Sequence, residues 1–253
     1  MQFIAYKCMG FIKTIKRKYI KAKSLLESNS KIYGQNILIT GANSGLGFSL
    51  LNLLKANNNI LALTKENQSN IKNLSDHKIK LLNLNFELNK FNDEFKKKIL
   101  DFKTNIIINC AATFGPEKQS IDDINYDEFL KIFSINVFSA IEIIKICLKS
   151  NSLNQIINIS SDMGSIKLNH QGNYYYYRLS KTLLNSFTKN LSIDLKNKIN
   201  IYCIHPGSMK TKLNSGGILS SEYSARKIIN ILSKNKIKNN GRFIDINEKI
   251  LDW

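Results

Sequence analysis

The sequence predicts a single α/β domain built around a doubly wound, mainly parallel β-sheet. From residue 36 onward, short runs of β-branched residues alternate with longer helical patterns, as in repeated strand-helix-strand units. The short runs are almost continuously apolar, which is typical of strands covered by helices on both faces. With 253 residues, 43% of them apolar, the chain can bury a full core, and this length suits one domain better than two small ones.

Strands are expected in this order along the domain: residues 37–40, 60–64, 79–83, 105–109, 155–160, 199–204 and 242–246. Helices are expected between them, near residues 47–57, 89–102, 126–150, 174–196 and 221–234. No internal repeat and no linker divides residues 35–253, so we interpret them as one domain.

Residues 1–34 differ from the rest of the chain because bases alternate there with apolar residues; the bases are Lys7, Lys13, Lys16, Arg17, Lys18, Lys21, Lys23 and Lys31. This pattern predicts a basic amphipathic helical extension that can lie on an anionic membrane surface. A helix packed on the domain, or a frayed tail, is the alternative. Lys7 and Lys13 interrupt the apolar part, which argues against a cleaved signal peptide.

Charge and residue usage argue against several classes of protein. The net charge of +18 comes from 37 Lys and Arg against 19 acids. No Cys/His finger, aromatic RNA-binding motif or basic heptad region accompanies this charge, so no nucleic-acid partner is expected. The four cysteines lack CxxC spacing and the three histidines lie far apart, so no metal site is expected. No apolar run is long enough to cross a bilayer. A cytoplasmic protein is therefore expected, with contact to the inner face of a membrane through residues 1–34 left open.

The predicted first strand runs into a glycine turn and then a helix, in the order Thr40-Gly41-Ala42-Asn43-Ser44-Gly45-Leu46-Gly47-Phe48. Glycines let the backbone approach a pyrophosphate, and the start of a helix offers unpaired N–H groups and a favourable dipole. The GxxxGxG spacing differs from GxGxxG and from the P-loop. A glycine turn without a ligand is the alternative. The residues assigned to the cofactor here are Gly41, Asn43, Ser44, Gly45, Leu46 and Gly47.

Tyr177 and Lys181 form a second motif, because an interval of four residues places both side chains on one face of a helix. Tyr177 is the member of a run of four tyrosines that has a lysine at this interval. A phenol has a pKa of about 10, and a neighbouring ammonium favours the phenolate. We therefore expect Lys181 to lower the pKa of Tyr177 and suit it to proton transfer.

These motifs and three others resemble, in order, the landmarks of the short-chain dehydrogenase/reductase family; the others are Asn109-Cys110-Ala111-Ala112, Asn136 with Ser160-Ser161, and His205-Pro206-Gly207-Ser208-Met209-Lys210-Thr211. The resemblance covers nearly all of residues 36–253. It implies a Rossmann fold and an oxidoreductase that transfers a hydride between NAD(P)(H) and a carbonyl or alcohol group. Residues 160–166, the tyrosine run and residues 241–253 resemble the branch that contains sniffer-type carbonyl reductases and the bacterial C-factor.

The resemblance also implies roles for single residues. Tyr177 is the general acid or base, Lys181 hydrogen-bonds the nicotinamide ribose, Ser161 polarises the substrate oxygen, and Asn136 holds a water that relays protons to Lys181. Asn109 and Ala111 line the adenosine ribose, while Cys110 and Ala112 depart from the family motif. The backbone of the segment with Pro206 and Gly207 receives the nicotinamide carboxamide, and Thr211 closes on the cofactor. A homo-oligomer, either a dimer or a tetramer, is expected as well.

Two further choices concern the catalytic serine and the cofactor. Ser160 and Ser161 are adjacent at a strand end and should point to opposite faces, and Ser161 matches the family's catalytic serine. Lys65, at the end of the second strand, stands where an acid would bind a free ribose hydroxyl. It favours a 2′-phosphate, hence NADP(H) over NAD(H), although Glu66 follows it. Asn85 stands near the adenine where the family has Asp.

Alternative functions remain open. One is a nucleotide-binding signalling or scaffold protein without turnover, and another is an epimerase or dehydratase of the same fold. The short segment between Thr211 and Ser221 leaves little room for the larger substrate domain of those epimerases. The expected substrate is a small carbonyl or alcohol compound that the sequence does not identify.

Overall fold

The computed structural model describes residues 32–65, 78–83, 91–196, 198–211, 214–234 and 240–253. A seven-stranded sheet runs through this body in the order β3-β2-β1-β4-β5-β6-β7, and every neighbouring pair is parallel. The strands are β1 (Asn36–Thr40), β2 (Asn59–Thr64), β3 (Ile79–Asn83), β4 (Ile106–Asn109), β5 (Gln155–Ile159), β6 (Asn200–His205) and β7 (Phe243–Asp245). The predicted doubly wound α/β fold is thus confirmed.

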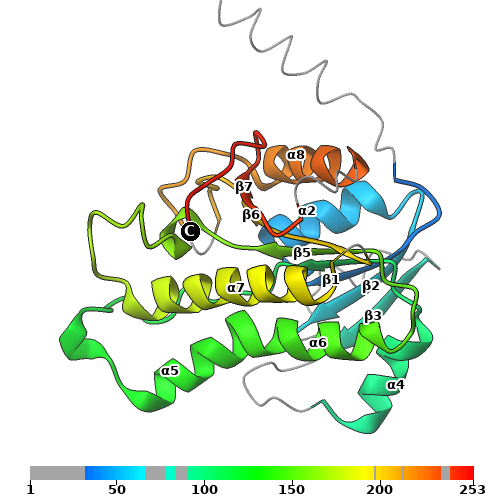
Figure 1. Ribbon diagram of the computed structural model, residues 1–253, viewed down its shortest axis with the longest axis horizontal. Coiled ribbons are helices and arrows are strands. Elements are labelled where there is room, and N and C mark those ends of the chain that lie inside the picture. The colour runs from blue at the N-terminus through cyan, green and yellow to red at the C-terminus, as the bar shows by residue number, and fades with distance from the viewer. Residues whose placement is uncertain (1–31, 66–77, 84–90, 197, 212–213, 235–239) are drawn as a thin grey trace, which may run out of the picture.

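Helices cover both faces of the sheet (Figure 1). One face packs against α2 (Gly45–Leu54) and α8 (Ser221–Lys234). The other packs against α4 (Asp93–Asp101), α6 (Ser139–Leu148) and α7 (Tyr175–Asp194), and α5 (Tyr126–Phe133) precedes α6. Short helical turns lie at η2 (Ile121–Asp123), η3 (Ser134–Phe138) and η4 (Asp162–Gly164).

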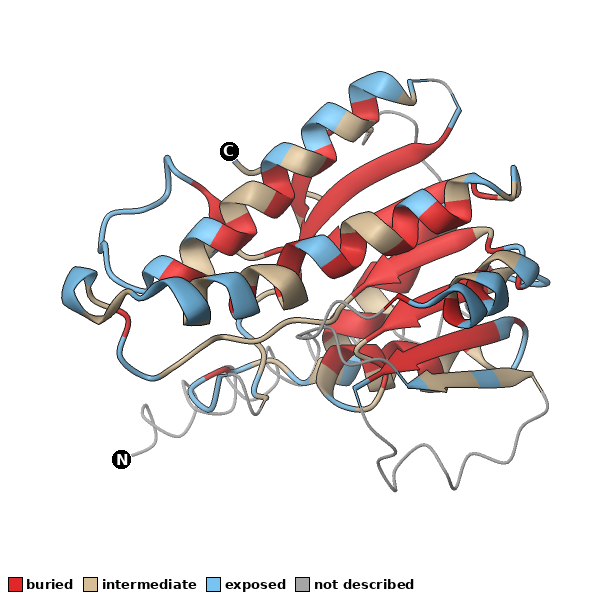
Figure 2. Cartoon of the chain, turned by 90° about the horizontal axis from the view of Figure 1, so that it is seen from below, coloured by how far each residue is buried: buried red, intermediate tan, exposed pale blue. Residues whose placement is uncertain are grey.

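Successive side chains of the central strands point to opposite faces of the sheet and pack into two separate apolar cores. In β1, Ile37 and Ile39 join the core beneath α2 and α8, whereas Leu38 joins the core beneath α4 and α6. Ile107 of β4 and its neighbour Ile108 divide in the same way. Because both faces of these strands are buried, the side chains on both faces must be apolar, which explains the continuous hydrophobic runs. Figure 2 shows the central strands buried and the outer faces of the helices exposed.

The amino-terminal end of the described body is tied to the sheet. Ile32 is buried in the core beneath α2, and the backbone N–H of Gly34 donates to the carbonyl of Asn57 at 2.8 Å. The predicted basic amphipathic extension lies almost wholly in residues 1–31, outside the described residues, so its conformation stays a prediction, as does a domain boundary at residue 35. Among the described residues, no helix has both the length and the apolar character needed to span a bilayer.

Two differences between the predicted and the observed helices go beyond a shift of their ends or change how a helix begins. The single helix predicted over 126–150 is α5, then the π-helical turn η3, then α6. A π-helical turn is a single-turn feature inside a longer helix, so the helical pattern of the sequence alone did not reveal it. The helix predicted from residue 174 begins at Tyr175, because Tyr174 is left-handed with φ of 53°.

The central strands predict a stability test. Ile157 in β5 is fully buried, so Ile157→Ala should lower the free energy of unfolding by about 2–5 kcal/mol through lost burial and a residual cavity. Ile121→Ala is the matched control, since Ile121 is 64% exposed and its change should stay within about 0.5 kcal/mol. Urea unfolding of both variants measures the difference. Equal losses would contradict the packing described here.

Candidate active site

The candidate site lies at the edge where the parallel strands end. β1, β4, β5 and β6 finish at Thr40, Asn109, Ile159 and His205. The carboxyl ends of parallel strands meet at one edge, and ligands of such sheets bind where the strand order reverses. The order β2-β1-β4-β5 puts this reversal between β1 and β4. The chain segments that follow these two strands therefore form the centre of the site.

The glycine turn after β1 packs against the segment after β4. Gly41 has φ of +65°, and a Cβ there would lie 2.9 Å from the Cα of Ala111. The hydroxyl of Thr40 accepts the backbone N–H groups of Cys110 and Ala111 at 3.0 and 2.9 Å. A Cβ on Gly47 would lie 2.3 Å from the carbonyl oxygen of Gly41. Both glycines are required by this close approach of backbone segments.

Helix α2 begins at Gly45, which has φ of +52°. Ser44 occupies the N-cap position without a side-chain hydrogen bond to the helix. The first N–H groups of an α-helix have no partner within the helix, and here no cap occupies them, so they suit an anion. A Cβ on Gly45 would be 3.8 Å from the methyl group of Thr211. The loop after β6 therefore comes back to the start of α2.

Asn109 is fixed by a buried polar chain. Its Nδ2 donates to Oδ1 of Asn158 at 2.8 Å, and Asn158 donates to the hydroxyl of Thr188 at 2.8 Å. This chain links β4, β5 and α7. The Oδ1 atom of Asn109 is buried and has no hydrogen-bond partner among the described residues. Asn109 thus supports the sheet at the site. Its contact with the adenosine ribose of a cofactor stays a prediction.

Tyr177 and Lys181 lie on consecutive turns of α7, as their spacing predicts. Lys181 is 2% exposed, and its Nζ lies 5.6 Å from the centroid of the Tyr177 ring. The same Nζ donates to the carbonyl of Ile159, the last residue of β5, at 2.9 Å. The ammonium group is therefore held against the sheet, over the ring of Tyr177.

The electrostatics of this pair differ from the expectation. Burial raises the pKa of Tyr177 to about 12, opposed by a hydrogen bond with Ser161 and reinforced by the charge of Asp162. Burial also lowers the pKa of Lys181 to about 8. The net lowering of the Tyr177 pKa that was expected beside Lys181 is not met in this structure, where the pKa is raised. Desolvation disfavours the charged form of both groups and outweighs their attraction.

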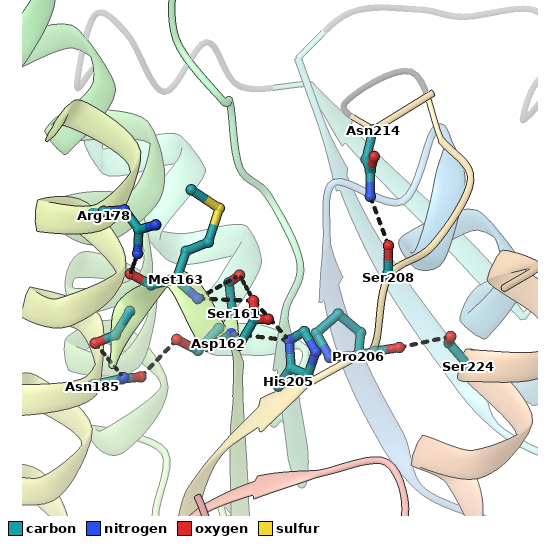
Figure 3. A network of polar contacts seen from close by, with 12 residues as sticks. Ser161, Asp162, Met163, Arg178, Asn185, His205, Pro206, Ser208, Asn214 and Ser224 are labelled. Atoms are coloured by element: carbon teal, nitrogen blue, oxygen red, sulfur yellow. Dashed lines mark hydrogen bonds and ion pairs between the residues drawn. The ribbon is translucent and has the colours of Figure 1, made fainter. Parts of the chain in front are cut away.

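Ser160 and Ser161 point in different directions, as predicted for neighbours at a strand end. The hydroxyl of Ser160 is buried and donates to Oδ1 of Asn185 at 2.6 Å, away from the phenol. Ser161 hydrogen-bonds Tyr177 and accepts the backbone N–H of Met163 at 3.2 Å. Of the two serines, Ser161 is therefore the one that contacts the phenol. Figure 3 shows Ser161 together with Met163.

Asn136 lies in the π-helical turn η3 and is 2% exposed. Its Nδ2 donates to the carbonyl of Thr113 and to the hydroxyl of Ser180, both at 2.9 Å. Its Oδ1 accepts the backbone N–H of Thr113 at 2.8 Å. The amide therefore joins the segment after β4 to α7, and both of its donors are used by protein atoms. A water relay through Asn136 stays a prediction.

Three further predicted residues can be placed in the structure. Lys65 is exposed directly after β2. The carbonyl of Pro206 accepts the Ser224 hydroxyl at 2.8 Å, and Gly207 has φ of +79° where a Cβ would meet Leu219 at 2.6 Å. Asn85 falls outside the described residues, so the structure does not place it.

Gln119 is a contributor that sequence reasoning missed. It is 2% exposed, its Nε2 donates to the carbonyls of Phe114 and Pro116, and its Oε1 accepts the backbone N–H of Tyr177 at 3.2 Å. It fixes the start of α7 to the loop after β4, where the Phe114 ring lies 4.8 Å from that of Tyr177. No motif marks Gln119, because its role depends on contacts between distant segments.

Comparison with known proteins agrees with this geometry. The family model described as short chain dehydrogenase matches residues 35–217. The protein named C-signal from Myxococcus xanthus is 24% identical over 164 residues, which are 63% of this chain and 98% of that protein. The probable short-chain type dehydrogenase/reductase VdlC of Helicobacter pylori is 28% identical over 193 residues, or 69% of this chain and 65% of that protein.

Solved structures give the same result. Carbonyl reductase Sniffer of Drosophila melanogaster superposes with a TM-score of 0.79 at 29% identity, covering 87% of this chain and all of that chain (100%). The NADPH-bound carbonyl reductase from chicken fatty liver has a TM-score of 0.74 at 21% identity, covering 88% and 95%. At that lower identity the likeness shows the fold alone.

Gly47 provides a test of the glycine turn. A methyl group there would meet the carbonyl of Gly41, which the sheet holds in place, so Gly47→Ala should cost about 1–3 kcal/mol of unfolding free energy. Gly216→Ala is the control, because a Cβ at Gly216 finds nothing closer than 3.7 Å. Urea unfolding measures both changes. If Gly47→Ala were as stable as Gly216→Ala, the close approach would be refuted.

Proposed function

The chain belongs to the short-chain dehydrogenase family, and we propose that it transfers a hydride between NADP(H) and a small carbonyl or alcohol compound. The observation that carries this proposal is the convergence of Tyr177, Lys181 and Ser161 at the carboxyl end of β5, from two separate elements of the chain. The 29% identity to a structure named carbonyl reductase over most of the chain supports a carbonyl substrate.

Each polar group would have a distinct part in the reaction. The phenol of Tyr177 would give its proton to the carbonyl oxygen during reduction, or take the alcohol proton in the reverse direction. The hydroxyl of Ser161 would hydrogen-bond the same oxygen. The ammonium of Lys181, with a pKa of about 8, is mostly charged at neutral pH and would stabilise negative charge on Tyr177. Asn136 would hold α7 and the segment that follows β4 in fixed positions relative to each other.

The residues present fit a dinucleotide. The close backbone approach at Gly41 and Gly47 and the uncapped start of α2 suit a pyrophosphate. Asn109 and Ala111 would line the adenosine ribose. The backbone at Pro206 and Gly207 would receive the nicotinamide carboxamide, and Thr211 would close on the cofactor. When bound, the cofactor supplies or accepts the hydride. Lys181 would also hydrogen-bond the nicotinamide ribose.

Lys65 supports NADP(H) over NAD(H). It directly follows the second strand of the sheet, β2, where an acidic side chain would bind a free ribose hydroxyl and a base suits a 2′-phosphate. Asn85 is proposed near the adenine from the sequence alone. A homo-oligomer, a cytoplasmic location and membrane contact through residues 1–34 stay predictions.

A signalling protein that binds a nucleotide without turnover is the second candidate. The likeness to the protein named C-signal, over 98% of its length, favours it. The two candidates differ in whether the phenol of Tyr177 is needed, because nucleotide binding alone uses no proton donor.

Tyr177→Phe separates them. Loss of the proton donor should lower kcat by about a hundredfold to ten thousandfold, while NADPH binding, followed by fluorescence titration, persists. Turnover would be followed as NADPH oxidation with a panel of aromatic and aliphatic aldehydes and ketones. Tyr175→Phe is the matched control, since Tyr175 is exposed at the start of α7, and it should keep full activity. Bound NADPH with no turnover of any carbonyl by the unaltered chain would favour the signalling protein.

Lys65→Ala tests the choice of cofactor. Loss of a charge-assisted contact with the 2′-phosphate should weaken NADPH binding about tenfold, with little change for NADH. Lys55→Ala, at the far end of α2, should affect neither. Calorimetric titration with both cofactors gives the ratio, and an unchanged preference would remove Lys65 from the proposal.

A further inference from the structure

Asp162 and His205 form a polar network around Ser161 that the proposed reaction does not yet use (Figure 3). The hydroxyl of Ser161 donates to Oδ1 of Asp162 at 2.9 Å. The same Oδ1 accepts the backbone N–H of Met163 at 2.9 Å. The backbone N–H of Asp162 donates to Nδ1 of His205 at 3.0 Å, and that Nδ1 lies 3.7 Å from Oδ1.

This network fixes the direction of the Ser161 hydrogen. A serine hydroxyl has one hydrogen to donate. When Ser161 donates to Asp162, it presents only lone pairs to its other neighbour, the phenol of Tyr177. Ser161 can then accept a hydrogen bond from the phenol of Tyr177. The Ser161 hydrogen bond that lowers the pKa of Tyr177 needs Ser161 as the donor to the phenolate, and donation to Asp162 competes with it. The arrangement therefore favours a phenol that keeps its proton.

The charge of Asp162 acts in the same direction. A carboxylate near a phenol disfavours the phenolate, and Asp162 contributes in this way to the raised pKa of Tyr177, after burial. Lys181 faces Tyr177 from α7 and opposes this effect by its charge. The side chain of Asp162 is 58% exposed, so water screens its charge and the effect should be modest.

The uncharged imidazole of His205 anchors the backbone of Asp162. Nδ1 of His205 accepts an N–H and therefore carries no hydrogen of its own. Burial lowers the pKa of His205 below its usual range, while the carboxylates of Asp162 and Asp245 oppose this lowering. At neutral pH the imidazole is uncharged and leaves the carboxylate of Asp162 with its full negative charge.

We propose that Asp162 is a positioning residue for the reaction, anchored by His205, which holds the Ser161 hydroxyl and directs the site toward proton donation by Tyr177. The inference rests on the proposed function and deepens it, because it assigns carbonyl reduction as the direction for which the site is arranged near neutral pH. Alcohol oxidation then requires a higher pH, at which Tyr177 loses its proton.

The test is the pH profile of Asp162→Asn in the full chain. Asparagine keeps an oxygen for Ser161 and Met163 and removes only the charge. The fastest carbonyl probe of the panel is used for reduction with NADPH, and its alcohol for oxidation with NADP⁺. Removal of the charge lowers the pKa of Tyr177, so the midpoint of the rise in oxidation rate should move to lower pH by about half a unit to one unit.

Three further variants separate charge, hydrogen bond and fold. Asp162→Ala should show a larger shift than Asp162→Asn, because Ser161 loses its acceptor and becomes free to donate to the phenolate of Tyr177. His205→Ala removes the acceptor of the Asp162 N–H and should also move the midpoint to lower pH, by less than Asp162→Asn, because the carboxylate is then held less firmly beside Ser161. Asp101→Asn is the control for charge, since Asp101 is at the end of α4 and borders a different cavity, with Asn36 and Asn59 at the opposite edge of the sheet.

The outcomes are distinct. A midpoint for Asp162→Asn that equals that of the unaltered chain, or lies at higher pH, would overturn the inference and leave the proposed function intact. A shift of equal size in Asp101→Asn would also overturn it, because the effect would then be general. If the unaltered chain turned over no probe in either direction, the proposed function itself would fail and the inference with it.

Discussion

The close contact between the segments that follow β1 and β4 is the constraint on which the site depends. Gly41 lies so near Ala111 that no side chain fits between them, and the hydroxyl of Thr40 accepts two N–H groups from the neighbouring segment. In a parallel sheet the strand order can reverse here only if the backbones separate toward opposite faces. This contact brings the start of α2 and the end of β4 together at the candidate site.

Buried polar groups then hold the reactive side chains against that point. The ammonium of Lys181 is fixed by the carbonyl of Ile159, and the start of α7 is fixed by Gln119. Because these groups are removed from water, desolvation rather than attraction between Tyr177 and Lys181 decides their pKa values. Such perturbed groups collect at functional sites. The edge of the sheet that holds these side chains rigidly therefore also carries the groups with perturbed pKa values.

The sequence predicted the strands well because burial on both faces leaves a direct hydrophobic signature. It also predicted that Tyr177 and Lys181 meet, since helical spacing alone determines this, and that Ser160 and Ser161 diverge. It could not predict the π-helical turn around Asn136, the left-handed Tyr174 or the contacts of Gln119, which depend on segments distant in the chain. The direction of the Tyr177 pKa shift was predicted wrongly, because spacing gives the nearest charge but not the depth of burial.

The structure of this chain crystallised with NADP⁺ tests the central claim most directly. The account predicts that the pyrophosphate lies on the start of α2, with the nicotinamide ring beside the Tyr177 hydroxyl and the ribose within hydrogen-bond distance of Lys181 Nζ. A dinucleotide bound elsewhere on the chain, or a nicotinamide ring on the far side of α7 from Ser161, would contradict it.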